Sequence, residues 1–195
     1  MEFWFDFGSN YSYLSVMRIS ALAQRHGVTV QWRPFLLGPL FKALGWDNSP
    51  FVLQKEKGRY MQQDMARECR KYGLQPWKQP SEFPRHSLLP VRVALYGEDQ
   101  PWIAPFCERI MLRNFAEDRS ISTEADVGEV LAALGLDPAP ILAGAQTDAN
   151  KLRLRERTEQ AHQRGVFGAP SFFVGDEMFW GNDRLDDAVT QATRA

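Results

Sequence analysis

Sequence patterns typical of β-strands occur only near the two ends of this chain. Residues 3–7 form an aromatic, strand-like run, and residues 28–34 alternate in polarity and are rich in β-branched side chains. Residues 35–165 carry helical periodicity and no strand signal. The strand signal then returns at 169–174 and 177–180, on either side of a Gly-Asp turn. Any sheet in this protein must therefore combine the two ends of the chain around a long helical segment.

The order of these segments predicts the fold class. The first two strands enclose a helix at residues 11–26, and a crossover of this length makes a right-handed βαβ unit with parallel strands. The second pair of strands is a proline-led hairpin followed by a last helix. We therefore predict an α/β, thioredoxin-like fold with a large all-helical insertion. Residues 1–38 and 160–195 would form a discontinuous thioredoxin-like domain, and 39–159 the helical insertion.

Bulk composition excludes several classes of function. A net charge of −1 gives no reason to expect a nucleic-acid partner, and no apolar run is long enough to cross a membrane. The N-terminus lacks a signal-peptide pattern, so we expect a cytoplasmic protein. Cys69 and Cys107 lie far apart and outside any metal or redox spacing. We expect both to be buried and unpaired, and we expect no metal site.

The turn between the first strand and the first helix is the best candidate for a reactive site. Ser9 lies where a strand enters a helix, and unpaired backbone N–H groups at a helix N-terminus bind anions. Its hydroxyl could donate to a phosphate, carboxylate or thiolate bound there. The more common role of such a residue is to cap the helix, and Ser9 or Asn10 could do this. The turn alone leaves both interpretations open.

Three motifs, taken in order, resemble one known family. Residues 5–14 read Phe-Asp-Phe-Gly-Ser-Asn-Tyr-Ser-Tyr-Leu, residues 165–172 read Gly-Val-Phe-Gly-Ala-Pro-Ser-Phe, and residues 181–185 read Gly-Asn-Asp-Arg-Leu. They resemble the 2-hydroxychromene-2-carboxylate isomerases, which are related to kappa-class glutathione transferases and to DsbA-type oxidoreductases. Asn48, followed by Lys57, is similar to the kappa-class pattern. The resemblance covers nearly the whole chain.

Two features of the first motif affect the chemistry. Asn10 stands where the family usually has proline, and its side chain could cap the helix instead. Ser9 and Ser12 occupy the positions that a Cys-x-x-Cys pair would fill in a DsbA-type protein. Thiol–disulfide exchange needs an attacking and a resolving thiol, so these residues exclude that activity.

The resemblance implies that glutathione is the cofactor. Ser9 would donate a hydrogen bond to the glutathione thiolate and, with the helix N-terminus, lower the pKa of the thiol below its usual ~8.5. A cis peptide bond would precede the family's proline and expose a strand edge to the cysteinyl backbone. The start of the last helix would bind the γ-glutamyl end, and a lysine assisted by an asparagine would bind the glycyl carboxylate. These roles fall on Asn48, Lys57, Ala169, Pro170, Asn182 and Asp183.

Without the resemblance, these residues have ordinary interpretations. Lys57 would be a solvated helix residue, and Pro170 would simply begin a strand. Asn182 or Asp183 would be the N-cap of the last helix, a role we expect in either case.

The resemblance also implies a small aromatic carboxylate substrate. The family interconverts 2-hydroxychromene-2-carboxylate and trans-o-hydroxybenzylidenepyruvate through reversible addition of the glutathione thiolate. Such a substrate needs a flat apolar pocket and a cation for its carboxylate. Candidate wall residues, all of which could equally be ordinary core, are Trp4, Tyr11, Phe35, Trp77 and Phe83. Arg85 or His86 could supply the polar contacts.

Three other functions remain open from the sequence. The same thiolate could serve a kappa-like transferase or thiol peroxidase acting on another electrophile. The chain could also be a non-catalytic thioredoxin-like binding module. A hydrolase with Ser9 as nucleophile would need His86 or His162 as base, but no Gly-x-Ser-x-Gly elbow is present. Family members tend to be dimers, so we expect a homodimer.

Overall fold

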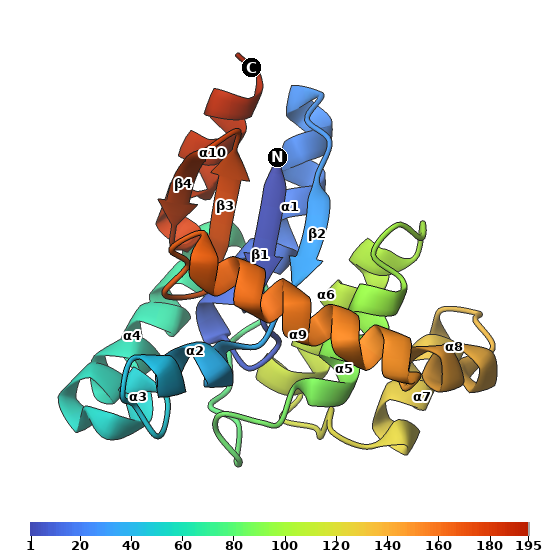
Figure 1. The fold of residues 1–195 in the computed structure, drawn as a ribbon. Helices are drawn as coiled ribbons and strands as arrows, with labels where there is room; N and C mark the ends of the chain where they lie inside the picture. The colour runs from blue at the N-terminus through green and yellow to red at the C-terminus, as the bar shows by residue number, and fades with distance from the viewer. Residues whose placement is uncertain (195) are drawn as a thin grey trace.

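The two ends of the chain form one four-stranded sheet, as predicted. The computed structural model describes residues 1–194. The strand order is β2-β1-β3-β4, with β1 (Glu2–Phe5) parallel to β2 (Gln31–Pro34). β3 (Ser171–Val174) runs antiparallel to β1, and β4 (Glu177–Trp180) completes the hairpin (Figure 1). The α/β thioredoxin-like fold class is thus confirmed.

Helix α1 (Asn10–His26) joins the two parallel strands and has both of its predicted ends. Ser9 caps the N-terminus by accepting from the Ser12 N–H, and Gly27 ends the helix at φ 65°. β2 begins at Gln31 rather than at residue 28. Its partner β1 is short, so Gln31 already pairs with the first residue of β1.

The helical segment between the two halves is also confirmed. Among the described residues, none between 35 and 165 belongs to a strand. α3 is a single turn that the sequence did not predict, and the division of the chain into two domains stays a prediction. The helices of this segment are α2 (Leu37–Ala43), α3 (Pro50–Leu53), α4 (Lys55–Tyr72), α5 (Leu88–Tyr96), α6 (Ile103–Phe115), α7 (Glu124–Ala133), α8 (Pro138–Ala145) and α9 (Asp148–Gln163).

The sheet is buried on both faces. Phe3 stacks on Phe172 at 5.3 Å between ring centroids, in the main core that α1 covers. Trp4 points to the opposite face because successive strand residues alternate. There it lies in a smaller core with Phe35 and Ala161 of α9. Figure 1 shows α1 and α10 (Leu185–Ala192) behind the sheet and α9 crossing in front of its lower end.

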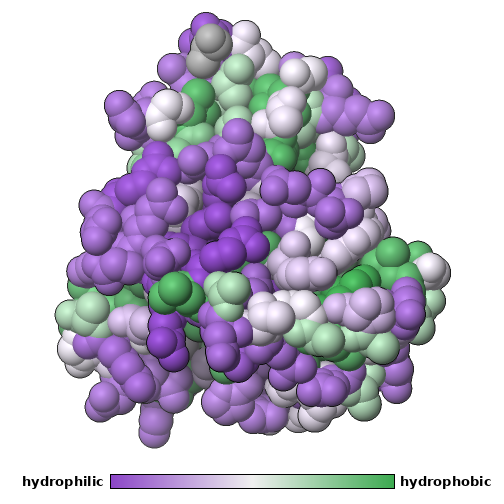
Figure 2. Space-filling model, turned by 45° about the vertical axis from the view of Figure 1, so that its right-hand side comes forward, coloured by the Kyte–Doolittle hydropathy of each residue, from purple (hydrophilic) through white to green (hydrophobic). Residues whose placement is uncertain are grey.

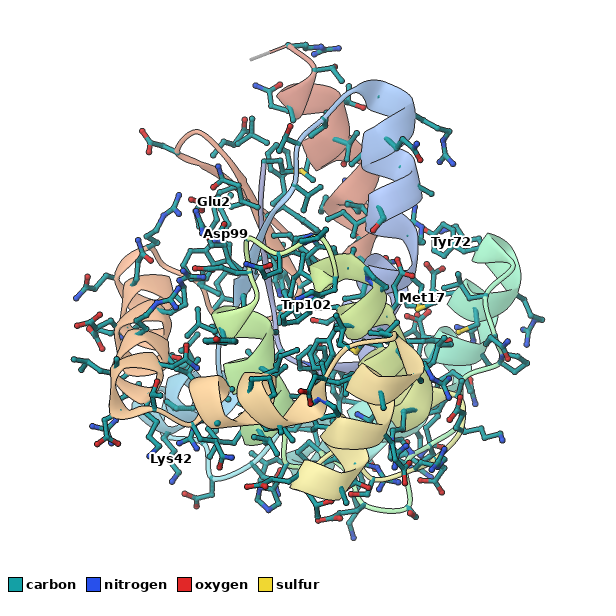
Figure 3. All side chains as sticks on the ribbon, turned by 90° about the vertical axis from the view of Figure 1, so that its right-hand side faces the viewer. Glu2, Met17, Lys42, Tyr72, Asp99 and Trp102 are labelled. Atoms are coloured by element: carbon teal, nitrogen blue, oxygen red, sulfur yellow. The ribbon has the colours of Figure 1, made fainter. Side chains whose placement is uncertain are left out.

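The interior of the insertion is closely packed. Trp102 points inward in Figure 3, and a Cβ added at Gly97 would lie only 1.9 Å from its ring, so only glycine fits there. Cys69 and Cys107 are buried and unpaired within residues 1–194, as expected. No helix within residues 1–194 has the length and apolar character to cross a membrane.

The outer surface of α9 is highly charged. Glu98 is nearly buried and accepts from Arg153 and Arg157, each at 2.8 Å, with Arg33 at 3.6 Å. Figure 2 shows hydrophilic side chains across the middle of this face. The charges pair with one another and join β2 to α9.

A second ionic network holds α6 to α7. The Arg113 guanidinium, only 5% exposed, lies 3.0 Å from Asp126 and 2.7 Å from Glu129. Asp126 also completes a capping box with Thr123. Burial raises the pKa of Asp126. Hydrogen bonds from Ser120, Thr123 and Arg113 outweigh this effect and hold that pKa well below its usual range.

We expect Asp126→Ala to lower the free energy of unfolding by about 3 kcal/mol, because it removes one of the two carboxylates that pair with a buried guanidinium and also breaks the capping box of α7. Asp148→Ala is the matched control, since Asp148 is exposed and its one ion pair among residues 1–194 is with Lys151. The Asp148→Ala variant should lose about 0.5 kcal/mol or less of its free energy of unfolding. Urea denaturation at neutral pH measures both, and equal losses would contradict the assigned role of Asp126. Because its pKa is lowered on folding, the contribution of Asp126 should disappear as the pH falls below the normal aspartate range.

Candidate functional site

A cavity of about 1250 Å³ opens at the carboxyl end of β1. Its walls come from the β1–α1 turn, α2 to α4, the loop at residues 83–88, and the two ends of the β3–β4 hairpin. The cavity therefore brings together segments from both ends of the chain and from the helical insertion. The predicted site residues that line it are Ser9, Tyr11, Asn48, Lys57, Phe83, Arg85, His86, Ala169, Asn182 and Asp183.

Ser9 is the N-cap of α1, and its hydroxyl proton is bonded to a backbone carbonyl. Its Oγ accepts from the Ser12 N–H at 3.2 Å, which caps α1, and it donates to the Ala169 carbonyl at 2.8 Å. The next residue, Asn10, does not cap the helix as considered above. It is the first helical residue and is buried, and its Nδ2 has no partner within residues 1–194. The hydroxyl of Ser9 thus lies at the wall of the cavity and at a helix N-terminus.

The peptide bond between Ala169 and Pro170 is cis, as the resemblance implied. Pro170 is buried and does not line the cavity, whereas Ala169 does. The Pro170 carbonyl accepts from the Gly181 N–H at 3.0 Å, which ties the start of β3 to the end of β4. Ala169 therefore lies at the cavity wall directly beside Ser9, to which its carbonyl is bonded.

Asp6 is a site residue that the sequence analysis missed. It is 3% exposed and lines the cavity just before the turn. Its two carboxylate oxygens accept from the Gly8 N–H at 2.9 Å and the Leu37 N–H at 2.8 Å. Burial raises the pKa of Asp6, although these N–H groups and Ser87 act in the opposite direction. Asp6 links the turn that carries Ser9 to the first residue of α2.

The start of the last helix differs from the prediction. Residues Asn182–Arg184 form a 3-10 turn ahead of α10, and neither Asn182 nor Asp183 caps a helix with its side chain. Asn182 Oδ1 instead accepts from Ser15 at 3.2 Å and from Arg18 at 3.0 Å. These two donors lie on α1, so side-chain pairing with α1 replaces the expected cap. Asp183 is exposed at the edge of the cavity.

Arg18 connects this region to α4. Its guanidinium lies 3.5 Å from the centre of the Tyr72 ring and also pairs with Asp186 at 2.6 Å. Figure 3 shows Tyr72 of α4 next to Met17 of α1. Arg18 therefore links α1 to the end of α4 and, separately, to the first turn of α10.

Lys57 and Asn48 both face the cavity from exposed positions on the insertion. The Lys57 ammonium lies 5.8 Å from the centre of the Phe51 ring. Asn48 Oδ1 accepts from the Ser49 N–H at 2.7 Å, so its Nδ2 points away from that bond. Both residues are placed where they could contact a ligand carboxylate.

Arg85 lines the cavity but its charge is already used. The guanidinium is 5% exposed, pairs with Asp118 and donates to Asn114 at 3.0 Å. It is therefore not free to bind a substrate carboxylate. Other cationic side chains line the cavity: Lys42, Lys57, Lys71 and Arg184.

Three of the aromatic candidates, Trp4, Phe35 and Trp77, lie outside the cavity. Phe35 is fully buried, with its ring centroid 6.0 Å from that of Trp4, and Trp77 packs against the main core. For these three residues, the ordinary core interpretation describes their position. His86 lines the cavity and His162 does not, and the Ser9 hydroxyl donates to a carbonyl rather than to a histidine.

Two aromatic pairs at the cavity mouth were missed. Phe167 and Trp180 are 45% and 52% exposed, with ring centroids 4.8 Å apart. Phe41 and Trp46 form a similar pair at 5.7 Å. A Cβ at Gly168 would lie 2.5 Å from the Trp180 indole nitrogen, so glycine permits this close approach. The position of Phe167 two residues before Ala169 was the available sequence signal.

Comparison with known proteins identifies the family of this chain. Residues 1–192 match the family described as DSBA-like thioredoxin domain. The chain is 31% identical to a 2-hydroxychromene-2-carboxylate isomerase of Sphingobium xenophagum, over 95% of this chain and 94% of the relative. It is 25% identical to glutathione S-transferase kappa 1 of Caenorhabditis elegans, over 95% and 87% of the two chains. A solved structure of a 2-hydroxychromene-2-carboxylate isomerase superposes with a TM-score of 0.87 at 31% identity, over 99% of this chain and 94% of that one.

Proposed function

We propose an isomerase function for this chain because it belongs to the DSBA-like thioredoxin domain family and, within it, to the 2-hydroxychromene-2-carboxylate isomerases. The proposed reaction interconverts 2-hydroxychromene-2-carboxylate and trans-o-hydroxybenzylidenepyruvate, with glutathione as a cofactor that each turnover regenerates. The observation that carries this proposal is the Ser9 hydroxyl, which lies at the N-terminus of α1 and is bonded to the backbone of Ala169 at the cavity wall.

The residues of the cavity fit a bound glutathione. The Ala169 carbonyl is a backbone acceptor for a peptide N–H, and Lys42 and Lys57 line the cavity as cations for a carboxylate. The buried Nδ2 of Asn10, which has no partner in the described chain, adds a donor near the same turn. When bound, the cofactor would supply a thiolate that adds reversibly to the conjugated carbon of the substrate and so permits rotation about the former double bond.

The chain would activate this thiol through hydrogen bonding and the helix dipole. Ser12 and Tyr13 N–H groups are already bonded to Ser9, which leaves the Asn10 and Tyr11 N–H groups without an intrahelical partner. These groups and the Ser9 hydroxyl would stabilise negative charge on sulfur and lower its pKa. The hydroxyl would have to turn from Ala169 toward the sulfur, and a peptide N–H of the cofactor could replace it at the Ala169 carbonyl.

The direct test is an assay of both substrates with purified protein. Glutathione should accelerate the approach to the chromene–benzylidenepyruvate equilibrium from either side, without net consumption of thiol. A ratio of the two compounds that responds to neither protein nor glutathione would refute the proposal.

The exposed aromatic pairs at the mouth favour a second candidate, because an open apolar rim admits other flat electrophiles. A kappa-like transferase would conjugate 1-chloro-2,4-dinitrobenzene with saturation kinetics and show no isomerase activity. Net loss of free thiol distinguishes the two reactions.

We expect Lys57→Met to weaken glutathione binding about 10-fold, the loss typical of one charge-assisted contact. Lys55→Met is the matched control, because Lys55 is an exposed residue of the same helical turn that does not line the cavity. Isothermal titration calorimetry measures both dissociation constants. A similar change in the two variants would show that Lys57 acts only through net charge.

A further inference from the structure

The cavity wall contains a tyrosine–aspartate pair that the reaction described above does not use. Tyr11 lies in the first turn of α1, two residues after Ser9, and Asp64 lies on α4. The Tyr11 hydroxyl donates to Asp64 Oδ2 at 2.8 Å, and both residues line the cavity. The pair therefore faces the same space as the proposed thiol site.

The pair is held in place from several sides. The Tyr11 ring lies 5.9 Å from the Phe51 ring, between centroids. The other oxygen of Asp64 lies 3.5 Å from Arg67, and Asp64 is 24% exposed, so the carboxylate retains access to the cavity. These contacts fix the direction in which the tyrosine proton points.

The hydrogen-bond donors and acceptors of this pair determine which ligand group can bind to this part of the cavity wall. A phenol has one proton to donate, and here Asp64 takes it. Burial first, and then Asp64, raise the pKa of Tyr11, so it keeps that proton at neutral pH. The lone pairs of Tyr11 and the carboxylate oxygens that remain are all acceptors. A ligand group at this position must therefore donate a hydrogen bond.

We propose that Tyr11 and Asp64 form an acceptor-only recognition site for the phenolic hydroxyl of the ring-opened substrate, and that this pair selects ortho-hydroxyaryl carboxylates over analogues that lack the hydroxyl. This inference rests on the proposed function for the identity of the substrate class. A site built to pair a hydroxyl rejects the analogue without it more strongly than an apolar pocket does, because a bound analogue shields the acceptors from water and leaves them unpaired.

Equilibrium binding of three stable probes tests the proposal without any turnover. The probes are trans-2-hydroxycinnamate, trans-2-methoxycinnamate and trans-cinnamate, each titrated calorimetrically at neutral pH with and without glutathione. The wild type should bind the hydroxy probe about 10-fold more tightly than the other two, the effect of about one buried hydrogen bond. Equal affinities for all three probes would overturn the proposal.

The variants separate Asp64 from general charge effects. In Asp64→Ala the tyrosine proton is released into the cavity, so the preference for the hydroxy probe over the methoxy probe should fall to about one or reverse. Asp47→Ala removes another carboxylate that lines the cavity and should leave the preference unchanged. An unchanged glutathione affinity in Asp64→Ala would show that the site is folded. Retention of the 10-fold preference in that variant would overturn the proposal.

The binding result is independent of the isomerase reaction. If the wild type selects the hydroxy probe but glutathione does not promote isomerisation, the recognition site stands and the proposed reaction falls. If isomerisation occurs without any preference among the probes, the reaction stands and the recognition site falls.

Discussion

Ser9→Ala is expected to reduce glutathione-dependent turnover by about 10²–10³-fold, the usual loss when one donor to a developing or bound anion is removed. The alanine keeps the helix N-terminus but has no hydroxyl to offer the sulfur. The apparent pKa of the bound thiol should therefore rise toward the ~8.5 of a free thiol. The ultraviolet absorbance of the thiolate, recorded across pH with protein and glutathione, measures this shift directly.

Ser12→Ala is the control that separates this effect from damage to the helix. Ser12 is fully buried three residues further on, and its Oγ has no partner among the described residues. Its removal should leave turnover within a few-fold of the wild type. Ser9→Ala also loses the helix cap, at a cost of about 1 kcal/mol, which circular dichroism and urea denaturation can verify. A bound thiol whose pKa stays low in Ser9→Ala would reduce Ser9 to a helix cap.

The fold was predictable because its main signals are local. Gly27 ends α1 at the predicted position since a left-handed residue is needed there, and the alternation around Trp32 placed the second strand. The single turn α3 was not predicted, because its start depends on the Ser49 cap and Pro50 rather than on any periodicity. Short elements give too few residues for a pattern.

The site was predictable only where a continuous motif carries it. Ser9 and Ala169 are in contact, as the two terminal motifs implied, although 160 positions separate them. Arg85 was expected to meet substrate, but its guanidinium is taken by Asn114 and Asp118, which are remote in sequence. The partner of a buried charge is a property of tertiary structure. Phe35 illustrates the same limit, because aromatic residues look alike in sequence whether they line a cavity or a core.

Asp6 is the position where stability and function are most closely coupled. We expect Asp6→Ala to lower the free energy of unfolding by about 3 kcal/mol in mildly acidic solution, since it leaves the backbone N–H groups of Gly8 and Leu37 without acceptors. Turnover should fall as well, because the carboxylate holds the Ser9 turn against α2. The control is Asp176→Ala, in the exposed hairpin turn, which should cost about 0.5 kcal/mol or less.

The pH dependence of this loss identifies its origin. Burial raises the pKa of Asp6 on folding, so the folded state binds the proton more tightly than the unfolded state. Wild-type stability must then decrease relative to Asp6→Ala as the pH rises from the ordinary aspartate value to the higher folded-state value, and stay level above it. Because every other carboxyl titrates alike in the two proteins, the difference between their unfolding free energies isolates Asp6. If wild-type stability instead increases with pH relative to Asp6→Ala, the N–H donors outweigh burial in their effect on the pKa of Asp6. Asp6 would then be a net stabilising anion beside the proposed thiolate.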